Sequence, residues 1–208
     1  VYFLKRNVKL ISTYNNNKNI KNKFPKVKWK KLDFKTKKNN YFKYLENPDI
    51  VINLSWPDIP NYKVKKHFKT FKYQKRFNYN LINNGLKNLM FLGTCFEYGK
   101  KNGKISEKTK PKPIIPYSIA KLNVLKSLLQ LKKKKKFKLS WLRPFHVYGN
   151  NKKRKTLFTI IKNLNEINGK FKINGKLVRD FVPVDFLCKV IVKLSLKNDD
   201  FGILNVCS

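Results

Sequence analysis

Apolar residues along this chain fall into short unbroken runs and longer, spaced stripes, and the two kinds of segment alternate. The short runs indicate strands, because strands buried on both faces of a parallel sheet read as continuous apolar segments. We expect them over residues 8–14, 27–34, 49–54, 88–94, 137–142 and 203–207. Stripes at helical spacing predict helices over residues 63–84, 117–131, 156–167 and 185–196. This alternation predicts an α/β fold, a doubly wound parallel sheet.

The net charge of +38 raises the question of a nucleic-acid partner, because lysine and arginine bind phosphates through counterion release. Lysine outnumbers arginine 44 to 5, whereas base and phosphate recognition favours the bidentate arginine fork. The lysines are also spread along the chain together with 26 asparagines, a composition that an A/T-rich genome explains without any partner. We therefore expect non-specific adhesion to anions and no specific nucleic acid.

Length and composition exclude several other classes of protein. The 208 residues suit one α/β domain, and 41% hydrophobic residues are too many for a disordered chain. No uncharged apolar run approaches the ~18 residues of a membrane helix. The cysteines and histidines lack the spacing of metal ligands or of a disulfide framework, which predicts no metal and favours a reducing, cytoplasmic setting. These residues are Cys95, Cys188, Cys207, His67 and His146.

Candidate chemistry comes from a tyrosine and a lysine four residues apart. On a helix this spacing puts both side chains on one face, where the ammonium stabilises the phenolate and lowers the tyrosine pKa. Such a tyrosine gives and takes a proton near neutral pH. The pairs with this spacing are Tyr14/Lys18, Tyr62/Lys66, Tyr117/Lys121 and Tyr148/Lys152. We choose Tyr117 and Lys121, because only Tyr117 begins an amphipathic helix after a buried strand that ends in a hydroxyl, Thr94.

Four segments, taken together, resemble a known family. They are Gly93-Thr-Cys-Phe-Glu-Tyr-Gly99, Tyr117-Ser-Ile-Ala-Lys121, Leu142-Arg-Pro-Phe-His-Val-Tyr-Gly149 and Val178-Arg-Asp-Phe-Val-Pro-Val-Asp185. In this order they resemble the NAD-dependent epimerase/dehydratase family of extended short-chain dehydrogenases/reductases, which act mainly on nucleotide sugars. The family pattern is a Ser or Thr shortly before Tyr-Gly, then Tyr-x-x-x-Lys, Arg-Pro-x-Asn-x-Tyr-Gly and Arg-Asp-Phe-x-x-Val-Asp. The resemblance spans nearly the whole chain.

This resemblance implies roles for several residues. Tyr117 would be the acid/base, Lys121 would lower its pKa and bind the nicotinamide ribose, and Thr94 would hold the reacting oxygen. The implied cofactor contacts are Asp33, Leu54, Ser55, Tyr117, Lys121 and Pro144, and the implied substrate contacts are Thr94, Cys95, His146 and Arg179. The cofactor would be NAD or NADP and the substrate a nucleotide sugar, and a homodimer through the helix of Tyr117 is also implied.

The sequence departs from the family pattern in several places. His146 stands where the family commonly has Asn, and Pro183 where it often has His, so the identity of the sugar stays open. The Gly-x-x-Gly-x-x-Gly turn that binds the pyrophosphate is not in this sequence. The chain also opens on Val1 rather than Met. We therefore expect a fragment that lacks the N-terminal glycine-rich turn and the C-terminal end of the family's substrate domain.

The resemblance implies a Rossmann-like NAD(P)-binding domain over residues 1–142. Residues 143–208 would hold the last Rossmann elements and part of a smaller substrate-binding region. The expected function is an NAD(P)-dependent oxidoreductase of nucleotide sugars, a 4-keto-sugar reductase or an epimerase, as used in cell-surface polysaccharide biosynthesis. Dehydratases of the family usually carry an additional acid pair near the Thr. Here Cys95 follows Thr94 and the loop before Tyr117 offers only Glu107, which argues against dehydration.

Simpler roles stay open for some of these residues. Arg179 and Asp180 would form a structural ion pair, and His146 would be a satisfied buried histidine. Glu97 would make local hydrogen bonds, and a role near the substrate stays open for it. Cys95 is interpreted as a small packed residue rather than a nucleophile. For the whole chain, the alternative is a non-catalytic binding module on a degenerate Rossmann fold, RNA-associated through its basic surface.

Overall fold

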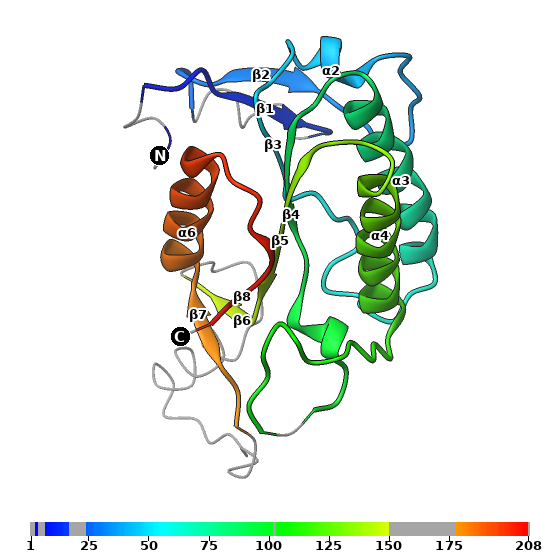
Figure 1. The fold of residues 1–208 in the computed structure, drawn as a ribbon, viewed down its shortest axis with the longest axis vertical. Helices are drawn as coiled ribbons and strands as arrows, with labels where there is room; N and C mark the ends of the chain where they lie inside the picture. The colour runs from blue at the N-terminus through cyan, green and yellow to red at the C-terminus, as the bar shows by residue number, and fades with distance from the viewer. Residues whose placement is uncertain (1–2, 4–6, 17–23, 102, 150–177, 208) are drawn as a thin grey trace.

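Four parallel strands form the central sheet, in the order β3–β4–β5–β8 (Figure 1). The computed structural model describes residues 3, 7–16, 24–101, 103–149 and 178–207. The strands are β3 (Val51–Asn53), β4 (Asn88–Leu92), β5 (Lys138–Pro144) and β8 (Gly202–Val206). Each overlaps one of the predicted apolar runs. The helix predicted over residues 156–167 lies outside the described residues.

Helices cover both faces of this sheet. α3 (Lys66–Asn83) and α4 (Pro116–Lys132) pack against each other on one face, and α6 (Val184–Lys197) lies on the other (Figure 1). Because neighbouring strands are parallel, each of these helices is part of a crossover connection. The doubly wound α/β fold predicted from the sequence is therefore confirmed.

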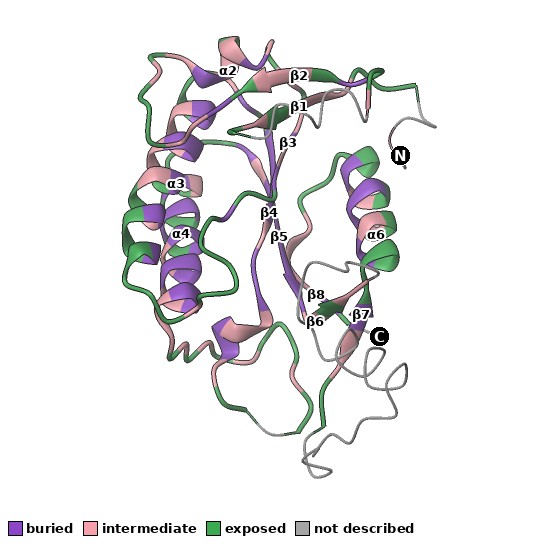
Figure 2. Cartoon of the chain, turned by 180° about the vertical axis from the view of Figure 1, so that it is seen from behind, coloured by how far each residue is buried: buried purple, intermediate pink, exposed green. Residues whose placement is uncertain are grey.

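The strand sequences explain why both faces are covered. Leu89 and Phe91 of β4 belong to the core shared with α3 and α4, whereas Met90 between them belongs to the core under α6. In β5, Trp141 belongs to the core shared with α3 and α4, and Leu142 belongs to the core under α6. Side chains of a strand alternate between faces, so a strand that is apolar at every position requires a covering layer on each side. Figure 2 shows the buried residues of β4 and β5 between these layers.

Two short parallel ladders accompany the central sheet. β1 (Ile11–Tyr14) pairs with β2 (Lys28–Lys31), and β6 (His146–Tyr148) pairs with β7 (Phe181–Pro183). The other short elements of the described residues are α2 (Tyr41–Tyr44) and the 3₁₀ helix η2 (Cys95–Tyr98). The hydrophobic pattern of the sequence did not indicate β6, β7, α2 or η2, because elements of three or four residues are too short for a hydrophobic period to appear. Within the described part of the chain, no helix has the length and apolar character needed to cross a membrane.

Candidate functional site

The candidate site begins where β4 ends. The strand stops at Leu92 rather than at Thr94, because Thr94 turns the chain into η2 as its N-cap. Its hydroxyl accepts a hydrogen bond from the Phe96 amide at 3.3 Å, and the Glu97 carboxylate accepts one from the Thr94 amide at 3.0 Å. This reciprocal pattern is a capping box, which holds the Thr94 hydroxyl at the carboxyl end of the strand.

Tyr117 enters the site from the first turn of α4. Pro116 occupies the first position of the helix, which suits its missing amide hydrogen, and the Tyr117 amide donates to the Tyr62 carbonyl at 3.1 Å. The phenol ring is buried, and a side-chain hydrogen bond links it to Thr94. Aromatic rings surround it at centroid distances between 5.1 and 6.4 Å: Trp56, Tyr62, His67 and Phe96.

Lys121 lies one helical turn after Tyr117 and is only 3% exposed. Its ammonium donates to the Leu92 carbonyl at the end of β4 and lies 5.5 Å from the centroid of the Tyr117 ring. It also lies 4.9 Å from the centroid of the Trp56 ring. Burial lowers the pKa of Lys121 to about 7, although the negative charge of Glu97 acts in the opposite direction. The structure thus brings Thr94, Tyr117 and Lys121 together at the end of β4.

The electrostatics of Tyr117 differ from the sequence prediction. Burial raises the pKa of Tyr117, and its hydrogen bond with Thr94 opposes this rise. We expected the pKa of Tyr117 to lie below its usual value because of Lys121, but in this structure it lies above that value. The physical reason is that desolvation of the phenolate outweighs the effect of a lysine whose ammonium points to the Leu92 carbonyl.

The residues expected to contact the cofactor follow the ends of strands. Leu54, which is 53% exposed, and exposed Ser55 come directly after β3. Pro144 is the buried last residue of β5. Asp33 follows β2, where one of its carboxylate oxygens accepts a hydrogen bond from the Lys35 amide at 2.9 Å. Leu54, Ser55 and Pro144 therefore lie at the carboxyl ends of central-sheet strands, where α/β sheets of this kind bind ligands, whereas Asp33 follows a strand of the separate β1–β2 ladder.

Two residues expected to contact the substrate form a polar contact. Nη1 of exposed Arg179 donates to Nε2 of His146 at 3.0 Å, so the imidazole hydrogen sits on Nδ1. Burial and the charge of Arg179 together lower the pKa of His146. The pKa of Cys95 is raised to about 12 by burial, so this thiol stays protonated at neutral pH and does not suit a nucleophile. Among the described residues, no cluster of His, Cys, Asp or Glu suits a metal ion.

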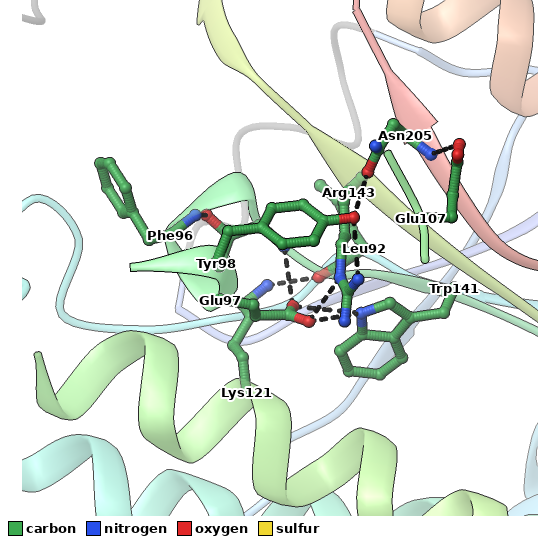
Figure 3. Close-up of polar contacts among 10 residues, drawn as sticks. Leu92, Phe96, Glu97, Tyr98, Glu107, Lys121, Trp141, Arg143 and Asn205 are labelled. Carbon is green, nitrogen blue, oxygen red and sulfur yellow. Dashed lines mark hydrogen bonds and ion pairs between the residues drawn. The ribbon is translucent and has the colours of Figure 1, made fainter. Parts of the chain in front are cut away.

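Two features of the site were not predicted from the sequence. The first is the central place of Glu97, which shares a buried network with Trp141 and Arg143 (Figure 3). The sequence did contain an indication of this feature, because a Thr followed three residues later by a Glu is the pattern of a capping box. The second is the hydrogen bond between Trp56 and His67, which connects residues with no characteristic spacing. The sequence carried no signal for this second feature.

The parallel sheet, helices on both faces and polar residues at the carboxyl ends of its strands define a Rossmann-like class of nucleotide-binding fold. The sequence model described as the NAD dependent epimerase/dehydratase family matches residues 1–207, and the chain belongs to this family. The family expected from the four sequence segments is thereby confirmed.

Known proteins of this kind are similar to the chain. A dTDP-6-deoxy-L-talose 4-dehydrogenase (NAD(+)) from Aggregatibacter actinomycetemcomitans is 27% identical over 167 residues. That match covers 79% of this chain and 62% of the relative, so this chain spans less than two thirds of the relative's length.

Solved structures share the fold. A UDP-glucose 4-epimerase from Thermotoga maritima, solved with UDP-glucose, has a TM-score of 0.82 at 20% identity, covering 100% of this chain and 71% of that one. A UDP-glucuronic acid 4-epimerase from Bacillus cereus, in complex with NAD, has a TM-score of 0.79 at 19% identity, covering 100% and 72%. These similarities establish the Rossmann-like architecture of the chain.

Proposed function

We propose that this chain carries the catalytic centre of an NAD-dependent oxidoreductase of nucleotide sugars, and that its reaction is the reduction of a 4-keto sugar. The observation that carries the proposal is the meeting of Thr94, Tyr117 and Lys121 at the end of β4. Membership of the family supports the reaction class. The curated relative is named as a 4-dehydrogenase that uses NAD(+), which supports the 4-position and the cofactor.

The protonation state of the site suits a reduction. Reducing a ketone adds a hydride to the carbonyl carbon and a proton to the carbonyl oxygen. Because burial raises the pKa of Tyr117, its phenol holds at neutral pH the proton that the oxygen must receive. The Thr94 hydroxyl would donate a hydrogen bond to the same oxygen. The Lys121 ammonium, 5.5 Å from the ring centroid, would stabilise the phenolate that remains.

The described residues fit the nicotinamide half of the cofactor. Lys121 is a buried ammonium with three donors, of which one reaches the Leu92 carbonyl, so donors remain to bind ribose hydroxyls. Leu54 and Ser55 would lie along the cofactor and Pro144 beside the nicotinamide, while Asp33 would face the adenine. When bound, the cofactor supplies the hydride. We place cofactor binding in residues 1–142 and most substrate contacts, including His146 and Arg179, in residues 143–208.

The proposal is tested by turnover with chemically defined substrates. The protein, expressed with any flanking residues that its gene encodes, is mixed with dTDP- or UDP-linked 4-keto sugars and NADH or NADPH. We expect one reduced cofactor to be consumed for each sugar, and the product mass to rise by two hydrogens. Preference for NADH over NADPH would support the choice of cofactor.

Two other outcomes would overturn the reductase proposal. Conversion of a 4-hydroxy nucleotide sugar into its epimer with no net change in the cofactor would identify an epimerase, which returns the hydride to the same sugar. No turnover of any sugar, together with sequence-selective RNA binding, would favour the binding module instead.

We also propose a cytoplasmic setting, which the free state of Cys95, Cys188 and Cys207 supports.

A further inference from the structure

A buried carboxylate lies directly beside the proposed catalytic residues. Glu97 is 0% exposed, and both of its side-chain oxygens accept hydrogen bonds (Figure 3). One accepts from the Thr94 amide at 3.0 Å and from the Trp141 indole at 3.1 Å. The other accepts from Nε of Arg143 at 2.8 Å. Partners of this kind are what a carboxylate requires away from water, so the structure holds Glu97 in one position.

The network continues from Arg143 to the far strand of the sheet. Arg143 is 1% exposed, and its Nη1 donates to the Tyr98 hydroxyl at 2.9 Å. That hydroxyl donates to the side-chain oxygen of Asn205 at 2.7 Å, and the backbone amide of Asn205 donates to the Glu107 carboxylate at 2.7 Å. The bonds therefore connect η2 with β5 and β8 (Figure 3). The buried ion pair between Glu97 and Arg143 is weak evidence for a contribution to stability, because desolvation offsets the attraction of the two charges. This is a reason to look for a role of the pair in the site.

Glycine at the strand end leaves room for this carboxylate. A Cβ atom at Gly93 would lie 2.3 Å from Nε1 of Trp141 and 2.7 Å from Oε1 of Glu97. The backbone next to Thr94 thus packs directly on the Glu97 network, and a shift of the carboxylate would move the Thr94 turn.

We propose that Glu97 is a positioning residue of the active site, whose carboxylate fixes the Thr94 turn against β5 and provides the negative charge that faces Lys121. The inference rests on the proposed function of Thr94, Tyr117 and Lys121. Glu97 is proposed to contact neither the carbonyl group of the sugar nor the Tyr117 hydroxyl. It acts on the site through its hydrogen bond with the Thr94 amide and through its charge.

The charge of Glu97 gives the proposal a signature that a purely structural residue would lack. Burial raises the pKa of Glu97 itself, while the charge of Arg143 and its hydrogen bond oppose this rise. In its ionised form, Glu97 raises the pKa of both Lys121 and Tyr117. Removing its negative charge would lower both pKa values, and the positive charge left on Arg143 would act in the same direction. The other groups that face this cluster are Cys95 on η2, Tyr62 before α3 and His67 on α3. None of these three changes in the variants proposed below.

The first test is the pH profile of sugar reduction. Reduction requires Tyr117 as a phenol and Lys121 as an ammonium, so activity is lost as pH rises through their pKa values. In Glu97→Gln, which keeps the shape of the side chain, we expect the alkaline limb of kcat to move to lower pH. We also expect kcat to fall on the order of 10- to 100-fold, because the Thr94 turn loses its anchor. Glu97→Asp keeps the charge, and we expect its alkaline limb to stay near that of the wild type.

Glu97→Gln leaves Arg143 as a buried charge without its partner, and this variant can fail to fold. The double variant Glu97→Gln/Arg143→Met removes both charges and avoids this problem. We expect its alkaline limb to lie below that of the wild type as well.

A second measurement needs no turnover. The ¹³Cε resonance of Lys121, assigned by its loss in Lys121→Arg, reports the lysine pKa directly during a pH titration. We expect a lower midpoint in the double variant than in the wild type, whose midpoint should lie at about 7. An unchanged or higher midpoint, or a kcat that falls with no shift of the alkaline limb, would overturn the role of Glu97. A wild type that reduces no 4-keto sugar would overturn the proposed function instead, while the titration would still test Glu97.

Discussion

The indole N–H of Trp56 donates a hydrogen bond of 3.1 Å to Nδ1 of His67, and both rings face Tyr117. Because Nδ1 accepts this bond, the imidazole hydrogen sits on Nε2, which donates to the Asn61 carbonyl at 2.9 Å. His67 is fully buried. Its two hydrogen bonds connect α3 to the loop that follows β3. This loop forms one wall around the candidate acid/base.

Replacement of His67 by Leu tests this connection. The change leaves the Trp56 indole and the Asn61 carbonyl without their partner, and we expect a loss of about 1–3 kcal/mol in the free energy of unfolding. Denaturant unfolding measures the loss. In a double-mutant cycle with Trp56→Phe, the two changes should be non-additive. Additive effects would show that the Trp56–His67 bond contributes nothing to stability.

Gly93 should not tolerate a side chain. In Gly93→Ala the new methyl group meets Trp141 and Glu97 at distances well below van der Waals contact, so we expect about 1–3 kcal/mol of destabilisation. Gly103→Asn serves as the control, because a Cβ there meets nothing and Asn tolerates the positive φ of 76°. Thermal unfolding of the two variants gives the comparison. Equal stability of Gly93→Ala and the wild type would contradict the packing described here.

Glu46 should make the stability of the chain depend on acid pH. Hydrogen bonds with Lys28, Lys30 and Lys9 lower the pKa of Glu46 from 4.5 to about 2. A lowered pKa contributes stability above the pKa of the unfolded state, and this contribution is lost as pH falls from about 4.5 through about 2. We expect Glu46→Gln to be less sensitive to this pH range than the wild type in denaturant unfolding. Added salt should reduce the difference, since these side chains are near solvent; identical pH profiles would refute the role of Glu46.

Thr94 has two roles, and both depend on its hydroxyl group. Thr94→Ser keeps the hydroxyl, and we expect it to retain most of the turnover and the N-cap. Thr94→Val keeps the shape but loses the hydroxyl, so we expect a fall in kcat of about 100-fold and about 1 kcal/mol of lost stability. Steady-state kinetics and denaturant unfolding measure the two effects. Equal turnover of the Val and Ser variants would remove Thr94 from the catalytic set.

The sequence was most informative where a local pattern determines the structure. The apolar run at Leu89 to Phe91 predicts a strand buried on both faces, and the stripe of α4 predicts its helix with Tyr117 in the first turn. Both were confirmed, because periodicity and burial are properties of consecutive residues.

Features that depend on tertiary contacts could not be predicted in this way. The pKa of Tyr117 was expected to fall because of Lys121, but it rises because several aromatic rings exclude water from the phenol. Arg143 lies 46 residues after Glu97, and no spacing in the sequence indicates that their side chains meet in the core. Desolvation and long-range pairing follow from the packed structure, whereas the sequence shows only which residue types are present.

The most direct test of the account is the turnover of Tyr117→Phe, because the single hydroxyl removed is the proposed proton donor. Tyr79→Phe is the matched control: it also removes one tyrosine hydroxyl, which bonds the Ser127 carbonyl at 2.8 Å away from Thr94 and Lys121. We predict that Tyr117→Phe lowers kcat for 4-keto-sugar reduction by about 10²–10⁴-fold and leaves folding intact, while Tyr79→Phe keeps its turnover. Undiminished turnover in Tyr117→Phe would contradict the assignment of the acid/base.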